Sequence, residues 1–442
     1  MPWMALSAAL LVGAAALLDP SNWPTPSEVV RVAASLGLLS AALYLPARPA
    51  RTAAAAAWVG VVAAAGMPVR PGQLGADFQT FYRGAQALFV SGLSPYTAQG
   101  ATAFPFPTFP AVHLLSLGGR LSPGDAYLAF VAVSAALLGL SFALLLDLSG
   151  RLGGRPAPEP GRLLLQAGLV LQPPILAGLG WGNSGALAGA CVTGGLWCWL
   201  RGRGRAAWHA AAGLLALAVM VKPQLLPAAA FFLVAACREA GRRPEARSRA
   251  AHVGRRVVPW GLGLVVLSLP LAVPASLLAY RDFLEVAQRW HTEVAATHAN
   301  NLALSALLAE AAARVWGLRV ADALAPVTAA LGLLVLAANL RTLRDDVPDA
   351  LPPFLPWLLS CLLWTSLVWD WYLTLVLAGP LLLLALAPPA GGEGRLAPAP
   401  LVAGIACCTT ASAAFFPAGI LLLYAYSLAA ARRRAPLEPA KA

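Results

Sequence analysis

Long apolar stretches separated by short polar segments recur along the whole chain, and three of them are Ala321–Leu340, Leu351–Leu367 and Trp371–Ala387. Each is close to the length that a helix needs to cross about 30 Å of hydrocarbon. Their apolar residues are continuous rather than alternating, which excludes a transmembrane β-barrel. The pattern predicts about twelve to fourteen crossing helices, at about 2–18, 28–46, 53–69, 124–148, 161–178, 184–200, 207–221, 223–237, 256–277, 321–340, 351–368, 371–387, 399–414 and 416–431.

The composition supports a chain whose solvent is largely lipid. Of the 442 residues, 59% are hydrophobic and only 11% are charged, whereas a soluble domain has about 25% charged residues. Residues 1–18 lack the basic segment that begins a secretory signal, so we expect them to remain as a first helix. We therefore predict an all-α polytopic integral membrane protein in which residues 1–442 form a single transmembrane domain.

The basic residues indicate which side of the membrane each end of the chain occupies. The formal net charge is +12, but this does not indicate a nucleic-acid partner, because most basic residues lie in short segments between apolar stretches. An excess of Lys and Arg in cytoplasmic loops sets the orientation of membrane proteins. This places both termini in the cytoplasm, together with basic segments at Arg48 and Arg51, Arg151–Arg162, Arg201–Arg205, Arg238–Arg256, Arg341 and Arg344, Arg395, and Arg432–Arg434.

Two of the expected extracytoplasmic segments are too long to be turns, residues 70–123 and residues 278–320. The cytoplasmic segment Arg238–Arg256 is predicted to contact anionic membrane lipids. The six cysteines lie inside or at the ends of apolar stretches and are interpreted as packing residues, without a disulfide or a metal site.

The first outer segment contains the strongest candidate for a chemical role. Asp77 precedes a helical pattern that runs from Phe78 to Phe89, Gly92 ends that pattern, and a turn follows at Ser94–Tyr96. As a structural residue, Asp77 is predicted to cap the helix through its carboxylate. As a functional residue, it would lie just above the bilayer and remove a proton from an attacking hydroxyl.

Several short motifs, in the same order along the chain, resemble those of glycosyltransferase family 87, bacterial enzymes of the GT-C superfamily. They are Asp77 with Tyr82 and Arg83, Gly92–Tyr96, the Phe/Pro stretch Phe104–Pro110, Lys222-Pro223-Gln224, Asn300-Asn301 with Ser305, and Ser366–Tyr372. Where the family usually has Gly-Gln-x-Asn, this chain has Gly180-Trp181-Gly182-Asn183, which keeps Asn183 and lacks the glutamine. Ser366 also lacks the proline that usually follows it.

The resemblance implies a GT-C-type helix bundle with juxtamembrane helices on its outer face, in the bacterial plasma membrane. It implies a hexosyltransferase that moves a hexose, most often mannose, from a polyprenyl-phosphate sugar to a glycolipid or cell-envelope glycan. It further implies an inverting displacement with the active site on the extracytoplasmic face and Asp77 as general base. On this interpretation, the reaction would require no metal and no soluble nucleotide cofactor. The donor-binding residues would be drawn from Tyr82, Arg83, Tyr96, Asn183, Lys222, His298, Asn301, Asp370 and Tyr372.

Several of these residues have a structural alternative. In the predicted topology Asn183, Lys222, Asp370 and Tyr372 fall near the outer membrane face with Asp77, and charges there are candidates for function. A lysine can also place its ammonium at the interface by extending its side chain, and Asp370 can belong to an aromatic belt between two tryptophans.

A transporter or flippase of lipid-linked glycans is the alternative function. Many crossings interrupted by Gly and Pro fit it as well, but transporters built on inverted repeats have matching broken helices in both halves. The sequence has one clear break, at Lys222-Pro223.

Overall fold

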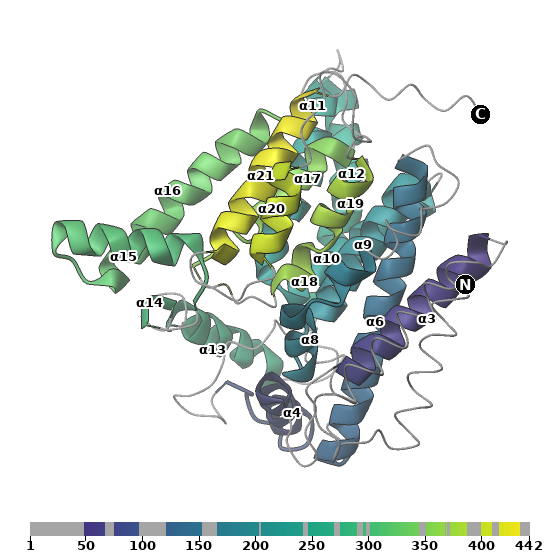
Figure 1. The fold of residues 1–442 in the computed structure, drawn as a ribbon. Helices are drawn as coiled ribbons and strands as arrows, with labels where there is room; N and C mark the ends of the chain where they lie inside the picture. The colour runs from purple at the N-terminus through teal and green to yellow at the C-terminus, as the bar shows by residue number, and fades with distance from the viewer. Residues whose placement is uncertain are drawn as a thin grey trace, which may run out of the picture.

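The structure is a computed structural model, and it describes residues 48–66, 75–96, 121–152, 166–202, 205–241, 246–268, 275–289, 295–297, 301–343, 351–366, 368, 372–386, 399–408 and 415–433. This part of the chain contains helices and no strand. The helices form a bundle, with a group of shorter helices at its lower end in Figure 1. The predicted helical class is confirmed.

Among the described residues, three helices are long and apolar enough to cross a membrane: α6 (Pro123–Leu152), α16 (Val320–Leu340) and α21 (Phe415–Arg433). The bundle also contains shorter apolar helices, among them α3 (Arg48–Gly66), α10 (Arg205–Val221), α11 (Leu226–Gly241) and α20 (Ala399–Cys408). Helices of this length and apolar composition are consistent with a helical membrane protein.

Small residues allow the helices of the bundle to pack closely. A Cβ on Gly139 of α6 would lie 2.6 Å from the carbonyl oxygen of Ala56 in α3, so these backbones meet only because the side chain is absent. Next to α6 lies α9 (Gly185–Arg201), which packs on α10. A Cβ on Gly189 of α9 would lie 2.5 Å from the carbonyl oxygen of Thr374.

Aromatic side chains fill the centre of the bundle between α11 and α17 (Leu351–Ser360). Phe231 contacts the rings of Phe354 at 5.3 Å and of Trp357 at 6.1 Å, both nearly edge to face. The apolar helix α19 (Ala378–Leu386) and the short helix α18 (Leu373–Val376) complete this core. Packing of this kind fixes the helices that carry the polar residues described below.

Several predicted crossings match the observed helices, notably 207–221, 321–340 and 416–431. The stretch 161–178 does not form one helix, because Pro173 and Pro174 start a separate helix, α8 (Pro173–Gly180). The stretch 351–368 is helical only to Ser360, and 371–387 is divided between α18 and α19. The predicted crossings 2–18 and 28–46 lie outside the described residues.

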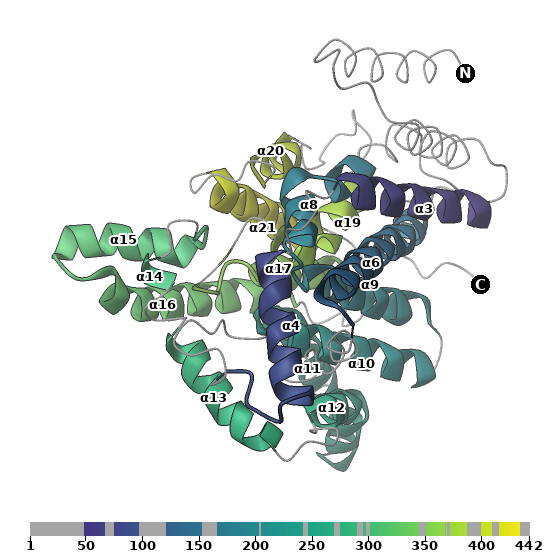
Figure 2. The same cartoon turned by 90° about the horizontal axis from the view of Figure 1, so that it is seen from below.

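The described parts of the two long outer segments are mostly helical. The first contains α4 (Ala76–Phe89), and the second contains most of α13 (Ala275–Arg289), α14 (Ala295–Thr297) and α15 (Leu304–Trp316). Figure 2 shows α4 and α13 across the lower end of the bundle, while α15 and α16 extend to one side. The described residues of the basic segment Arg238–Arg256 are helical and belong to the end of α11 and the start of α12 (Ala246–Ser268).

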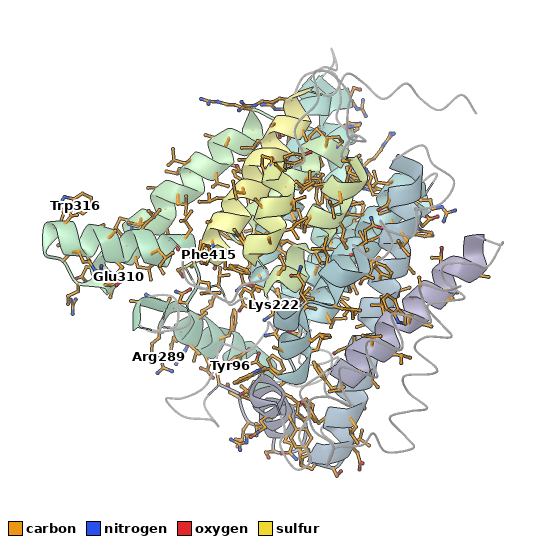
Figure 3. The ribbon with its side chains drawn as sticks, viewed as in Figure 1. Tyr96, Lys222, Arg289, Glu310, Trp316 and Phe415 are labelled. Atoms are coloured by element: carbon orange, nitrogen blue, oxygen red, sulfur yellow. The ribbon has the colours of Figure 1, made fainter. Side chains whose placement is uncertain are left out.

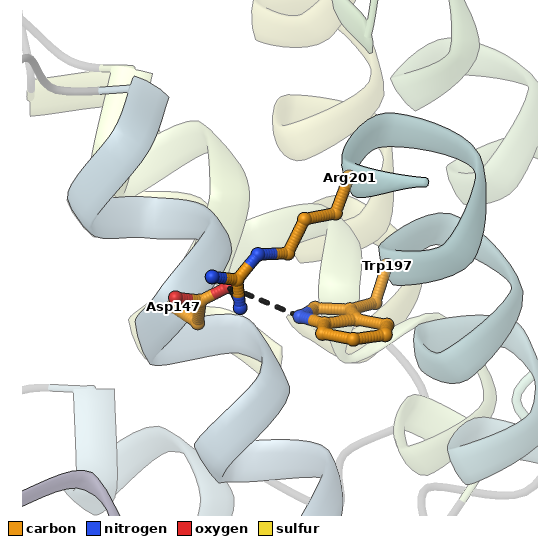
Figure 4. A network of polar contacts seen from close by, with 3 residues as sticks. All are labelled: Asp147, Trp197 and Arg201. Carbon is orange, nitrogen blue, oxygen red and sulfur yellow. Dashed lines mark hydrogen bonds and ion pairs between the residues drawn. The ribbon is translucent and has the colours of Figure 1, made fainter. Parts of the chain in front are cut away.

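An ion pair joins α6 and α9 near their ends, away from α4. The carboxylate of Asp147 accepts hydrogen bonds from Arg201 Nη1 at 2.8 Å and from Trp197 Nε1 at 3.0 Å (Figure 4). The guanidinium also lies 5.3 Å from the centre of the Trp197 ring. Because the pair is partly exposed, it positions the two helix ends more than it stabilises the fold.

Candidate functional site

The first turn of α4 is held against the turn between α8 and α9. The backbone N–H of Phe78 donates to the carbonyl oxygen of Trp181 at 3.1 Å. Gly182 follows with φ of +77°, and a Cβ there would lie 2.3 Å from the Cβ of Phe78. Only glycine therefore fits at position 182, both for its backbone angle and for the approach of α4.

Asp77 does not cap α4, so that structural prediction was wrong. Gly75 is the N-cap residue and makes no side-chain capping bond, whereas Asp77 lies within the first turn. Its Oδ2 instead accepts a hydrogen bond of 2.7 Å from Asn183 Nδ2. The Oδ1 of Asn183 accepts the backbone N–H of Gly185 at 2.8 Å, which fixes the orientation of its amide.

The environment of Asp77 favours its protonated form. Burial raises the pKa of the carboxyl above its ordinary value, and the hydrogen bond from Asn183 and the charge of Lys222 lower it in part. A carboxylate with a raised pKa is a stronger base than an exposed one, and such groups are common at catalytic sites.

Lys222 lies between the end of helix α10 and the start of the 3-10 turn η3 (Pro223–Leu225), where the helix is interrupted. Pro223 lacks an N–H and so ends the helical hydrogen bonding at this point. The Lys222 side chain is only 9% exposed, and Nζ lies 4.9 Å from the centre of the Tyr372 ring. Figure 3 shows Lys222 among the helices, near the lower end of the bundle.

A cavity of about 950 Å³ brings these residues together. Its polar end is lined by Asp77, Asn183, Lys222, Ser366 and Tyr372. The rest of its wall is mostly apolar and follows α11 and α16, with Leu226, Pro227, Ala230, Leu324, Ala325, Ala329, Gly332, Leu333, Val335 and Leu336. A volume of this size accommodates a ligand as large as a drug molecule.

The cavity opens sideways between α11 and α16. Leu226 of α11 and Leu333 and Leu336 of α16 line its wall and are also 45%, 68% and 42% exposed on the surface of the chain. From Leu324 to Leu336 the wall follows α16 for about 18 Å, given the helical rise of 1.5 Å per residue. The arrangement therefore combines one charged end with a long apolar groove.

Four predicted donor-binding residues, Tyr82, Arg83, Tyr96 and Asn301, are not among the described residues that line the cavity. The Tyr82 hydroxyl donates to the carbonyl oxygen of Leu121 at 2.8 Å and accepts from Gln86, which fastens α4 to the segment before α6. Arg83 is exposed. Tyr96 is buried against the ring of Phe283 in α13.

Asn301 is buried in a structural role behind the cavity wall. Its Nδ2 donates to the carbonyl oxygens of Ala295 and Ser366, and its Oδ1 accepts the backbone N–H of Ala303 and Val368, at 2.8 to 3.0 Å. The side chain thus joins the start of α15 to the segment after α17, which includes cavity residue Ser366.

Two further predictions, His298 and Asp370, lie outside the described residues. Within the described residues, no group of three His, Cys, Asp or Glu side chains is placed to hold a metal ion.

Sequence reasoning missed two cavity residues near Lys222 and the groove along α16. Gln224 belongs to the Lys-Pro-Gln motif, and Trp364 precedes the Ser366–Tyr372 motif, so both had a signal nearby. The groove had no signal in the sequence, because the residues of a uniformly hydrophobic helix do not indicate which of its sides faces a cavity. Searches of protein-family models, of curated proteins and of solved structures find no match for this chain.

Proposed function

We propose that this protein is a membrane glycosyltransferase that moves a hexose from a polyprenyl-phosphate sugar to a hydroxyl group of a glycolipid or cell-envelope glycan. The observation that carries the proposal is the combination of a carboxylate and an ammonium at one end of a cavity whose remainder is an apolar groove. A lipid-linked sugar phosphate has the same division, with a charged head and a hydrocarbon tail.

Asp77 would act as the general base of an inverting displacement. The acceptor oxygen attacks the anomeric carbon as its proton passes to the Asp77 carboxylate, and the bond from that carbon to the phosphate oxygen breaks. The electron pair of the broken bond leaves with the lipid phosphate. The hydrogen bond from Asn183 would hold the carboxylate in position for this transfer.

Lys222 would meet the charge of the leaving phosphate. Its ammonium lies on the same cavity as Asp77, and the two charges attract one another. A compact ammonium suits a phosphate bound as a point charge. Because charge on the phosphate oxygen grows as the bond breaks, this contact would strengthen in the transition state and so increase the rate.

The test is sugar transfer in purified membranes from radiolabelled polyprenyl-phosphate mannose to total lipid acceptors, for the wild-type chain and Asp77→Asn. The amide keeps the size of the side chain and can still accept from Asn183, but it is not a base. We expect transfer to fall at least about a hundredfold, as on loss of a general base.

Thermal unfolding in detergent provides the control for this variant. Because burial disfavours the charged carboxylate, Asp77→Asn removes that cost and should unfold at no lower temperature than the wild type. Full transfer by a folded Asp77→Asn variant would exclude Asp77 as the base. If the wild type transfers neither mannose nor other polyprenyl-linked hexoses, but moves lipid-linked glycans across vesicles, the protein is a flippase instead.

A further inference from the structure

Two residues beside Lys222 have no role in the proposed chemistry, Gln224 and Trp364. Gln224 lies on the 3-10 turn η3, two positions after Lys222, and Trp364 lies in the segment that follows α17. Both line the cavity. They come from distant parts of the chain and are joined by a hydrogen bond of 3.0 Å from Trp364 Nε1 to the backbone carbonyl oxygen of Gln224.

This hydrogen bond determines what Trp364 can offer a ligand. The indole has a single polar group, its N–H, and that group is already engaged by Gln224. The ring is therefore held in one orientation and presents only apolar surface to the cavity. A flat, rigid, apolar surface suits the C–H face of a pyranose ring.

The side chain of Gln224 offers the complementary polar contact. Its Oε1 is buried and has no hydrogen-bond partner in the structure. A buried amide oxygen without a partner is unfavourable, and native proteins usually satisfy such atoms. A hydroxyl group of a ligand in the cavity would donate to it.

The location narrows the identity of that ligand. In a sugar phosphate the pyranose is bonded directly to the phosphate, so the sugar must lie next to the cation that binds the phosphate. Gln224 is two positions from Lys222 in the chain and is hydrogen-bonded to Trp364, and all three residues line the cavity.

We propose that Gln224 and Trp364 form the hexose-binding subsite of this cavity, with the pyranose ring packed on the indole and one sugar hydroxyl donating to the Gln224 amide. This subsite rests on the proposed glycosyl transfer and adds to it the residues that select the sugar. A site built to hydrogen-bond a hydroxyl discriminates strongly against the analogue that lacks it.

The experiment measures kcat/KM for polyprenyl-phosphate mannose and for a series of donors that each lack one hydroxyl group. On the wild-type enzyme, one deoxy donor should lose about 10- to 100-fold more than the others. Gln224→Leu should lower kcat/KM for the parent donor by a similar factor. With the one deoxy donor, kcat/KM of Gln224→Leu should be almost the same as that of the wild type. Such non-additivity identifies the pair that makes the contact.

The matched control is Gln172→Leu. The Oε1 of Gln172 is likewise buried without a hydrogen-bond partner, and this residue is not among the described residues that line the cavity. It should leave the preference among donors unchanged. Because the ratio between two donors on one enzyme is independent of how much protein is folded, a partly folded Gln224→Leu variant still gives a clear answer.

Trp364 is tested with two substitutions. Trp364→Phe keeps a flat apolar ring and loses the N–H, whereas Trp364→Leu loses the ring, so the leucine variant should raise KM for the donor more than the phenylalanine variant does. Equal losses for Gln224→Leu on every donor would overturn the subsite while leaving glycosyl transfer intact. Absence of hexose transfer by the wild type would overturn both proposals.

Discussion

At the scale of single residues, the placement of Asp77 depends on Gly182. This glycine combines a φ of +77° with contact against Phe78, whereas Gly92 has a φ of +65° with open space around it. Gly92→Ala should cost about 1–2 kcal/mol for the left-handed backbone. Gly182→Ala should cost about 1–3 kcal/mol more for the clash and reduce sugar transfer, because α4 must move away from Asn183.

The measurement compares unfolding temperature and transfer for the two alanine variants. The difference between them isolates the contact between α4 and the turn before α9. Equal effects of the two substitutions would contradict the assignment of this contact as the one that positions Asp77.

The raised pKa of Asp77 predicts the pH dependence of transfer. Asp77 must be ionised to act as a base, so kcat/KM should fall as the pH decreases through its pKa. Because burial raises this pKa, the fall should occur above the pH range of an exposed aspartate. The hydrogen bond from Asn183 lowers the same pKa, so Asn183→Ala should move the acidic limb to higher pH.

The check is a pH–rate profile for the wild type and for the residual activity of Asn183→Ala. If the acidic limb of the Asn183→Ala profile stays at the same pH as in the wild type, or moves to lower pH, a group other than Asp77 controls the pH dependence.

Part of the site could be predicted at this scale. Asp77, Asn183, Lys222 and Tyr372 were predicted on one side of the membrane, and the structure places all four on one cavity. The capping role predicted for Asp77 was wrong, because the local preference of aspartate for a helix end gives way to a partner 106 positions away in the sequence. Such a partner leaves no local pattern.

At the scale of secondary structure, α16 forms one wall of the apolar groove. It packs mainly on α15 and reaches α17 near its far end, where Asn339 Nδ2 donates to Ser360 Oγ at 3.0 Å. Its middle is separated from α11 by the cavity. A helix in this position lines the cavity with one side and leaves residues on its other side exposed.

A leucine at Gly332 tests whether the groove holds a lipid tail. A Cβ at this position meets nothing within 4 Å, so the larger side chain enters the cavity without displacing the protein. Gly332→Leu should therefore keep its unfolding temperature and raise KM for the polyprenyl donor at least about tenfold, equivalent to about 1.4 kcal/mol of lost binding. Transfer kinetics with a full-length donor provide the measurement.

The matched control for this change is Gly261→Leu on α12. A Cβ at Gly261 also meets nothing within 4 Å, and this glycine is not among the described residues that line the cavity. It should leave KM unchanged. An unaltered KM in Gly332→Leu would show that the groove does not bind the lipid tail of the donor.

Some predicted apolar stretches form one continuous helix and others are interrupted. The apolar stretches at 207–221 and 321–340 became helices with nearly the predicted ends. The stretch at 161–178 is interrupted where Pro173 and Pro174 begin α8, whereas the helix in 351–368 ends at Ser360, after its three prolines. Pro326 lies inside α16 without interrupting it. Hydropathy measures how apolar a segment is and does not show whether its backbone stays helical throughout.

At the scale of the whole molecule, the distribution of charge predicts which face each element occupies. The site and α13 should be extracytoplasmic and the end of α21 cytoplasmic. Single cysteines at Arg281 of α13 and Arg432 of α21, both exposed positions, test this in a background without the native cysteines. In intact cells, a membrane-impermeant maleimide should label Arg281→Cys and not Arg432→Cys, which should react only after permeabilisation. The opposite labelling would invert the topology and place Asp77 in the cytoplasm.

On the proposed function, the sideways opening between α11 and α16 also determines which concentration of donor governs the rate. A substrate that enters through this opening arrives by diffusion within the bilayer, so its effective concentration is its mole fraction among the surrounding lipids. Inert lipid or detergent added at constant total donor would then act as a diluent and slow the reaction, although nothing in the aqueous phase had changed. For such a protein, an affinity expressed per litre of solution has no fixed meaning until the amount of lipid is stated.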